Sequence, residues 1–145
     1  MKQDVIAIMG AAFLGPAGVA TDYDHQGLYL LPAPVPQGHI PDESLIEELR
    51  LASPRRRNLD RTVLLALHTA LSAFAQAHWR PDSSIGVNIG TARGATSLLE
   101  HCHAIFLDTG EVPVYTSPFT TQGVISSWIG QELGASGPVF GHAST

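Results

Sequence analysis

The sequence has few charged residues and only one cysteine. Asp, Glu, Lys and Arg make up 14% of the 145 residues, whereas about a quarter is usual in a soluble domain. This shortage of charge predicts that a partner chain or a further part of the protein covers much of the surface. The single cysteine, Cys102, excludes an internal disulfide and is consistent with a reducing cytoplasm.

Long apolar runs and excess positive charge are also absent. No stretch of about 18 apolar residues occurs, so the sequence indicates no membrane-spanning helix. The formal net charge is −5, which argues against a nucleic-acid-binding surface. Positive charge is concentrated only in Arg55-Arg56-Arg57. We interpret this run as a solvated turn, with the alternative that it faces an acidic carrier protein.

Apolar runs and periodicity predict alternating strands and helices. Apolar runs closed by glycine, and one run after a Gly-Pro turn, predict strands at 5–10, 85–90 and 139–143. The expected helices are 41–50, a long one from Asn58 or Asp60 to about 78, 96–107 and 124–133, the last with Gly134 as its C-cap. A Gly-rich turn at 11–18 and a proline-broken surface loop at 21–38 complete the pattern. This order indicates an α/β fold.

Two of the expected helices carry apolar stripes that should be buried. The long helix has its stripe at Leu64, Leu67, Leu71 and Phe74, widened by alanines that predict close packing. The helix at 96–107 has its stripe at Leu98, Leu99, Cys102, Ile105 and Phe106. Both patterns are typical of helices that cover a sheet.

Neither a metal nor a dinucleotide cofactor is predicted. His101-Cys102-His103 looks like a metal cluster, but helical neighbours point about 100° apart and do not converge on one ion. We interpret the run as a buried Cys102 between two partly exposed histidines. In such an apolar setting the thiol stays protonated and is not a nucleophile. The turn at 11–18 does not match G-x-G-x-x-G.

The stretch from Ser117 to Thr145 carries a family resemblance. It contains a Ser-Pro turn, a helix ending in Leu133-Gly134, a Gly137-Pro138 turn and a strand. This stretch resembles the β-ketoacyl synthases, the condensing enzymes of fatty acid and polyketide assembly. The resemblance extends back to the segments 5–18, 61–73 and 86–91. Within the family, the segments Ser-Pro-Phe-Thr-Thr and Ile-Ser-Ser-Trp-Ile are most similar to the ketosynthase-like proteins of aryl-polyene and flexirubin pathways.

The resemblance implies a thiolase-type fold, in which helices cover a mixed, mainly parallel sheet. Residues 1–145 would form an incomplete portion of the ketosynthase N-terminal domain, with the remainder beyond 145 or in another chain. In the family a nucleophilic Cys lies eight positions after the Pro, which falls immediately after Thr145. No catalytic residue is therefore assigned here, and the 145-residue chain by itself is expected to be inactive.

The resemblance also implies near-site and interface residues. Thr120, Thr121, Gln122 and Thr145 are expected at the acyl pocket or beside the nucleophile, with an ordinary helix N-terminus and hydroxyl caps as the alternative. His142 is expected close to the site, with the alternative that it faces the helix that covers the sheet. The edge strand, at Val139 and Phe140, is expected to pair with a second subunit.

Three functions remain open from the sequence. The chain is expected to be part of a β-ketoacyl synthase that takes an acyl group from an acyl carrier protein and condenses it with a malonyl thioester. The alternative is a non-catalytic subunit of the chain-length-factor type, which shapes the pocket of an active partner. The residue after Thr145 discriminates them, because Cys favours the enzyme and Gln or Ala the partner. A free-standing binding domain ending at Thr145 is the third possibility.

Overall fold

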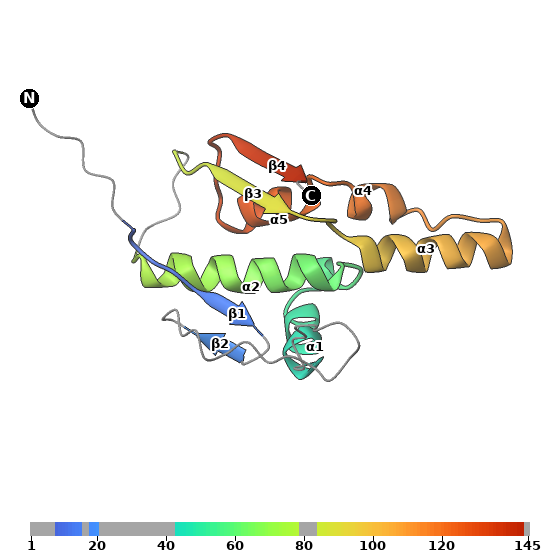
Figure 1. Cartoon of the computed structure of the whole chain (residues 1–145), viewed down its shortest axis with the longest axis horizontal. Coiled ribbons are helices and arrows are strands. Elements are labelled where there is room, and N and C mark those ends of the chain that lie inside the picture. The colour runs from blue at the N-terminus through green and yellow to red at the C-terminus, as the bar shows by residue number, and fades with distance from the viewer. Residues whose placement is uncertain (1–7, 16–17, 21–42, 79–83, 144–145) are drawn as a thin grey trace, which may run out of the picture. The chain divides into compact units, whose positions relative to one another are not determined.

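The computed structural model describes residues 8–15, 18–20, 43–78 and 84–143. Its elements are β1 (Phe13–Gly15), β2 (Gly18–Ala20), α1 (Glu43–Leu51), the 3-10 helix η2 (Pro54–Arg56), α2 (Arg61–Gln76), β3 (Val87–Thr91), α3 (Thr96–Thr109), α4 (Thr116–Thr120), α5 (Val124–Glu132) and β4 (Val139–Ala143) (Figure 1). Two compact units share these elements, one of Met1–Pro41 with Thr69–Arg80 and one of Asp42–His68 with Pro81–Thr145. No helix of the described ranges is long and apolar enough to cross a membrane.

The first unit joins a β-hairpin to the second half of α2. β1 and β2 pair antiparallel, from Phe13 opposite Ala20 to Gly15 opposite Gly18. Gly10 lies directly on the helix, because a Cβ there would overlap the carbonyl oxygen of Ala73. The amide of Ala11 donates to Oε1 of Gln76 at 3.2 Å. The close packing predicted from the alanines of this helix is therefore confirmed on this half.

The prediction of a strand at 5–10 is wrong for residues 8–10, the part of this range that the structure describes. Residues 8–10 belong to no strand, and Ile8 is 90% exposed. The backbone at Gly10 packs on a helix rather than beside a strand, which explains the difference. The hairpin instead occupies the segment where a Gly-rich turn was expected. Residues 5–7 and the predicted loop at 21–38 lie outside the described residues.

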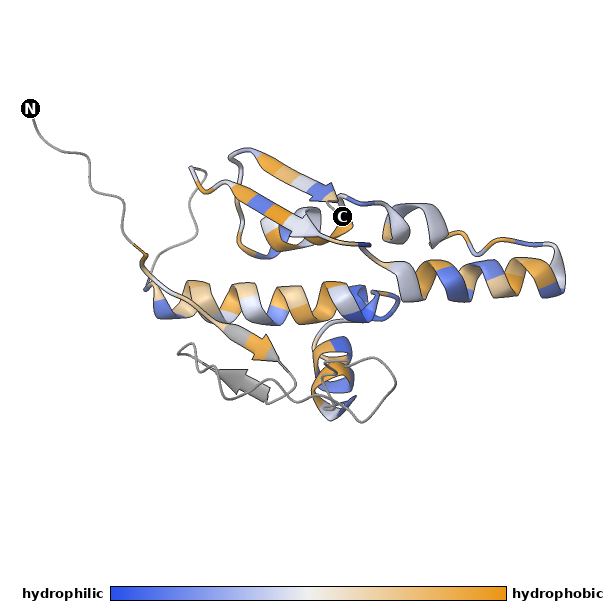
Figure 2. Ribbon diagram, in the orientation of Figure 1, coloured by the Kyte–Doolittle hydropathy of each residue, from blue (hydrophilic) through white to orange (hydrophobic). Residues whose placement is uncertain are grey.

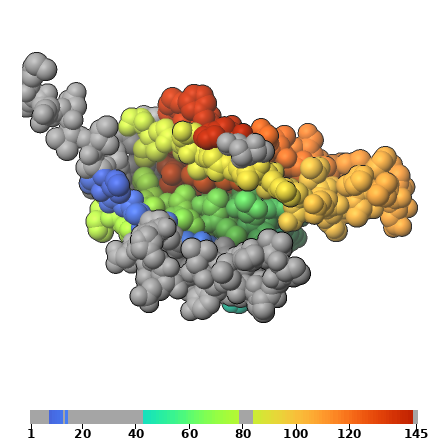
Figure 3. Space-filling model, in the orientation of Figure 1, coloured from blue at the N-terminus to red at the C-terminus, as the bar shows by residue number. Residues whose placement is uncertain are grey.

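The second unit is built on a parallel pair of strands. β3 and β4 run side by side in register, from Val87 opposite Val139 to Thr91 opposite Ala143, with α5 packed against the pair (Figure 1). The strands predicted at 85–90 and 139–143 are thus confirmed within two residues at each end. Both strands lie at the surface in Figure 3, and every residue of β4 is exposed.

Glycines allow α5 to approach β4 closely. A Cβ on Gly130 would lie 3.2 Å from Cγ2 of Val139, and one on Gly141 would lie 3.0 Å from Oγ of Ser126. The helix then ends as predicted at Gly134, which has a left-handed φ of 63°. The amide of Ala135 donates to Gly130 O at 2.9 Å, the long bond of a Schellman motif.

The hydrophobic core of the second unit comes mainly from α2 and α5. Of the predicted α2 stripe, Leu64 and Leu67 are buried as expected, whereas Leu71 and Phe74 are only partly covered. The buried apolar side chains are Ile46, Leu59, Val63, Leu64, Leu67, Val87, Ala95, Cys102, Val124, Ile125, Trp128, Ile129 and Leu133.

Two predictions about the middle of the chain need correction. The apolar stripe of α3 is only partly buried, because Leu99 is 49% and Phe106 is 44% exposed while Cys102 is fully covered. Figure 2 shows apolar positions recurring along α3. The Ser117-Pro118 segment is not a turn but part of the short helix α4. Proline is tolerated there because amides of the first helical turn have no intrahelical acceptor.

Asp60 joins the start of α2 to the start of α3. Its carboxylate is 4% exposed and accepts the amide of Thr62 at 2.7 Å and the amide of Leu98 at 2.8 Å. Of the two predicted caps for the long helix, Asp60 and not Asn58 therefore has the capping bond. The same side chain holds a helix that begins 36 positions later.

The arginine run is only partly solvated, so its interpretation as a solvated turn is wrong for Arg56, whereas Arg55 and Arg57 are exposed. Arg55 donates to Oε1 of Gln131 at 2.8 Å and lies 5.3 Å from the ring centre of Trp128. Arg56 pairs with Glu132 at 2.9 Å, with only 12% of its side chain exposed. These contacts fasten η2 to α5. Arg57 is exposed, and its guanidinium has no partner among the described residues.

We predict that Asp60→Ala lowers the free energy of unfolding by about 2–3 kcal/mol, because two amides lose their buried acceptor. Asp60→Asn keeps one acceptor oxygen and should lose less. Asp108→Ala, at an exposed α3 position, is the control and should change stability by under about 0.5 kcal/mol. Urea unfolding of the three variants measures the effect. A change for Asp60→Ala as small as that of the control would contradict the proposed linkage.

Candidate functional site

The carboxyl ends of β3 and β4 form the first candidate site. Because the strands are parallel and in register, Thr91 and Ala143 end at the same edge of the sheet (Figure 1). In α/β folds, ligands bind outside the carboxyl ends of parallel strands. The segments that follow these two strands therefore form a candidate binding site.

Of the predicted near-site residues in this segment, Gln122 lies against β4. Thr120 and Thr121, which precede it, have other surroundings. A Cβ on Gly141 would lie 3.3 Å from the carbonyl oxygen of Gln122, so this residue borders the strand. Thr120 turns back on its own helix, where its hydroxyl donates to Thr116 O at 2.6 Å. Thr121 is exposed at the end of α4. Thr145 lies outside the described residues.

His142 faces away from α5. Side chains alternate along a strand, and Val139 and Gly141 point toward the helix. The imidazole of His142 instead covers Gly90 on the other face, with Nε2 3.0 Å from the position that a Cβ would take there. The alternative that His142 faces the covering helix is therefore wrong. Its exposed position keeps the ring within reach of solvent or ligand.

The turn after β3 holds a residue whose role the sequence did not reveal. Gly94 has a left-handed φ of 67°, and its amide donates to Oγ1 of Thr91 at 3.0 Å. The hydroxyl of Thr96 donates to the carbonyl oxygen of Arg93 at 3.1 Å. These bonds fix the backbone on both sides of Arg93, whose side chain is exposed. The sequence signal that could have revealed it is a charged residue two positions after the Gly90-Thr91 strand end.

Cys102 has the surroundings predicted for it. It is 1% exposed, while His101 and His103 on either side are exposed. The thiol borders a small, largely apolar pocket of about 190 Å³ that Leu99, Phe106 and Val112 also line. In the described ranges, no group of three or more His, Cys, Asp or Glu side chains is placed to hold a metal ion.

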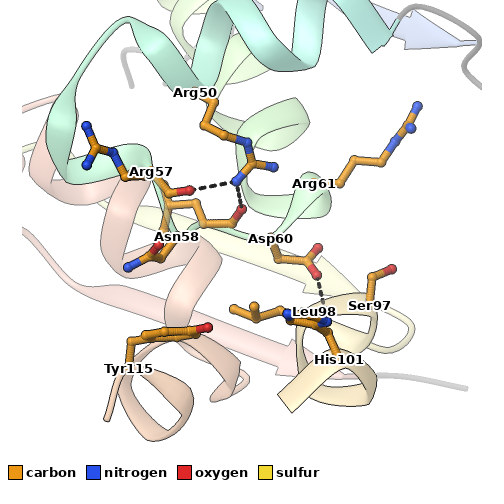
Figure 4. A pocket seen from close by; sticks show the side chains of 10 residues that line it. Arg50, Arg57, Asn58, Asp60, Arg61, Ser97, Leu98, His101 and Tyr115 are labelled. Carbon is orange, nitrogen blue, oxygen red and sulfur yellow. Dashed lines mark hydrogen bonds between the residues drawn. The ribbon is translucent and has the colours of Figure 1, made fainter. Parts of the chain in front are cut away.

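A second candidate site is a polar pocket between the η2–α2 junction and the α3–α4 region. Its volume is about 340 Å³. The lining residues are Arg50, Arg57, Asn58, Leu59, Asp60, Arg61, Ser97, Leu98, His101 and Tyr115 (Figure 4). They come from segments about 40 residues apart, which is why sequence patterns did not predict the pocket.

Positive charge dominates the wall of this polar pocket. Nη1 of Arg50 donates to Arg57 O at 2.8 Å and to Leu59 O at 3.0 Å (Figure 4), and its Nε lies 3.8 Å from Oε2 of Glu47, outside the lining. Arg61 pairs with Glu43. Asp60 is the only carboxylate in the lining, and both its oxygens already accept amides. The pocket is therefore suited to an anionic group.

Comparison with known proteins identifies the family. The model of the β-ketoacyl synthase N-terminal domain matches residues 21–145. No curated protein matches the chain. The matched region takes in α1 to α5, β3 and β4, and thus the whole of both candidate sites as described. The protein therefore belongs to the β-ketoacyl synthase family, and its fold is the thiolase-like α/β fold of that family's N-terminal domain.

Proposed function

We propose that this chain is the N-terminal portion of a condensing enzyme that joins an acyl thioester to a malonyl thioester with loss of carbon dioxide. The observation that carries the proposal is the family match through Gly137-Pro138 and β4. By the family spacing, a nucleophilic Cys would directly follow Thr145. The carboxyl edge of β3 and β4 would then border the reacting thiolate.

The chemistry explains why this position suits a nucleophile. A thiolate attacks the acyl thioester, forms a new thioester with the enzyme and releases the carrier thiol. Neutral pH favours the thiol unless nearby positive charge or a helix N-terminus lowers the thiol pKa. The described residues supply no such thiol, because Cys102 is buried within α3. Cys102 can therefore serve as an internal control.

We expect alkylation to identify the nucleophile in the protein purified from its native gene. Brief treatment with iodoacetamide, followed by peptide mapping, should modify a Cys directly after Thr145. Cys102 should react only after denaturation, since it is 1% exposed. Gln or Ala after Thr145 would instead support a chain-length-factor subunit, which shapes the pocket of an active partner. A mature protein ending at Thr145 would contradict the enzyme proposal.

The partner of the polar pocket is proposed to be an acidic acyl carrier protein. Arg57 supports this role, because it is exposed, has no partner among the described residues and lines the pocket. Arg55 and Arg56 are not available in the same way, since they are bound to α5. Complementary charge accelerates association and fixes orientation more than it raises affinity.

Arg57→Glu is therefore expected to raise the Kd for a purified acyl carrier protein about tenfold at low salt, mainly through slower association. Arg57→Lys keeps the charge and should bind nearly as the wild type does. Surface plasmon resonance at two ionic strengths measures the effect, which should shrink as salt screens the charges. Equal association rates for wild type and Arg57→Glu would exclude this docking surface.

A second copy of the protein is proposed to pair along β4. The strand has no neighbour on its second edge within the described ranges, and Val139 and Phe140 are 39% and 63% exposed. An exposed apolar edge favours pairing with another chain. Homodimers and ketosynthase/chain-length-factor heterodimers would both satisfy this edge.

We predict that Phe140→Lys weakens the dimer at least tenfold, because a charge on an edge strand opposes strand pairing. Leu51→Lys is the matched control, since Leu51 is 74% exposed but lies on α1. Sedimentation velocity over a concentration series measures the dimer dissociation constant. A wild-type dimer that is unaffected by Phe140→Lys would place the interface elsewhere.

A further inference from the structure

Arg93 differs from most arginines of the described ranges because its side chain makes no hydrogen bond or ion pair there. The sequence has eight Lys and Arg residues. Arg50, Arg55, Arg56 and Arg61 have hydrogen bonds or ion pairs. The side chain of Arg93 has neither among the described residues. Its carbonyl oxygen accepts the hydroxyl of Thr96, and the amide of the next residue, Gly94, donates to Oγ1 of Thr91. An exposed guanidinium on a fixed turn is available for an outside ligand.

The position of this turn selects the kind of ligand. Thr91 pairs with Ala143, so the turn leaves the sheet beside the end of β4, at a strand spacing of about 4.8 Å. Under the proposed function, a nucleophile directly after Thr145 would be at most about 11 Å from Ala143, because three peptide units would separate them. An acyl group attached to it would then lie near the carboxyl edge of β3 and β4. The side chain of Arg93 starts two residues beyond Thr91 at that same edge.

We infer that Arg93 is a specificity-determining residue that binds a carboxylate on the substrate of this site. This inference rests on the proposed function. Arginine presents parallel N–H donors that match the two oxygens of a carboxylate. An exposed cation would also be costly to cover with a purely apolar acyl chain. The site is thereby suited to an acyl group that ends in a carboxylate.

The malonyl extender also carries a carboxylate, but that group is a less suitable ligand. This carboxylate is lost as neutral carbon dioxide during condensation, and its negative charge moves to the enolate carbon that attacks the acyl group. A strong ion pair with the carboxylate would therefore stabilise the reactant more than the transition state. A carboxylate at the far end of the primer keeps its charge throughout the reaction. The two sources predict different effects of the same substitution.

The test compares succinyl and butyryl thioesters of N-acetylcysteamine, which have four-carbon acyl groups that end in a carboxylate or a methyl. Acylation of the full-length native protein is followed by intact mass. We expect Arg93→Met to lower the succinyl-to-butyryl rate ratio about 10- to 100-fold. Arg93→Lys, which keeps the charge but not the paired donors, should fall between. An unchanged ratio in Arg93→Met would overturn the inference.

Two further measurements separate the possible failures. If the extender were the ligand, Arg93→Met would raise the KM for malonyl thioester and leave the primer ratio unchanged, which also overturns the inference. If the wild type is not acylated at all, the proposed function fails. Binding of succinate and butyrate, followed by NMR on wild type and Arg93→Met, then decides the role of Arg93. A preference for succinate that Arg93→Met abolishes supports carboxylate recognition, and equal binding contradicts it.

Discussion

The close approach of α5 to the parallel pair of β3 and β4 is the constraint on which the candidate active-site edge depends. Two glycines make it possible, because Gly130 leaves room for Val139 and Gly141 leaves room for the start of the helix. A Cβ at either position would be in tight contact with a side chain of the facing element, which would have to shift by a few tenths of an ångström. With the glycines in place, the start of α5 borders the strand near its end, and the turn after β3 leaves from the same edge. The geometry of this edge therefore depends on glycine at positions 130 and 141.

Because the sequence has only eight Lys and Arg residues, the bonds of each described arginine show whether it is available to a ligand. Arg55 and Arg56 fasten η2 to α5, and Arg50 holds the carbonyls of Arg57 and Leu59. The bonds of Arg50 to Leu59 and of Arg56 to Glu132 are partly buried, whereas that of Arg55 is exposed, and all of them occupy N–H donors that a ligand would otherwise use. Arg57 and Arg93 are exposed, and each lies at one of the two candidate sites. Among the residues that the structure describes, the run of three arginines therefore contributes Arg57 as a cation with no bonded side chain, and Arg93 is a second one.

Local patterns predicted most elements of the second unit, with η2 and α4 as exceptions, but not the contacts that connect them. The helices α1, α2, α3 and α5 and the strands β3 and β4 follow from apolar periodicity, glycine breaks and caps. The bonds from Asp60 to Leu98 and from Arg56 to Glu132 join residues 38 and 76 positions apart. No periodicity encodes such pairs, so the polar pocket was not predicted. The strand at 5–10 failed for a similar reason, since contact of Gly10 with α2 overrode the local apolar run.

Asp60 links the two candidate sites within one rigid framework. Its carboxylate caps α2 on one side and holds the first turn of α3 on the other, and it lines the polar pocket itself. The helix that it holds begins three residues after Arg93, in a turn already fixed by Thr91 and Thr96. The polar pocket and the turn at the sheet edge therefore share a single buried anchor. A buried acceptor with two amide partners has no low-cost alternative conformation, so the spacing between the two sites is fixed by the fold before any partner binds.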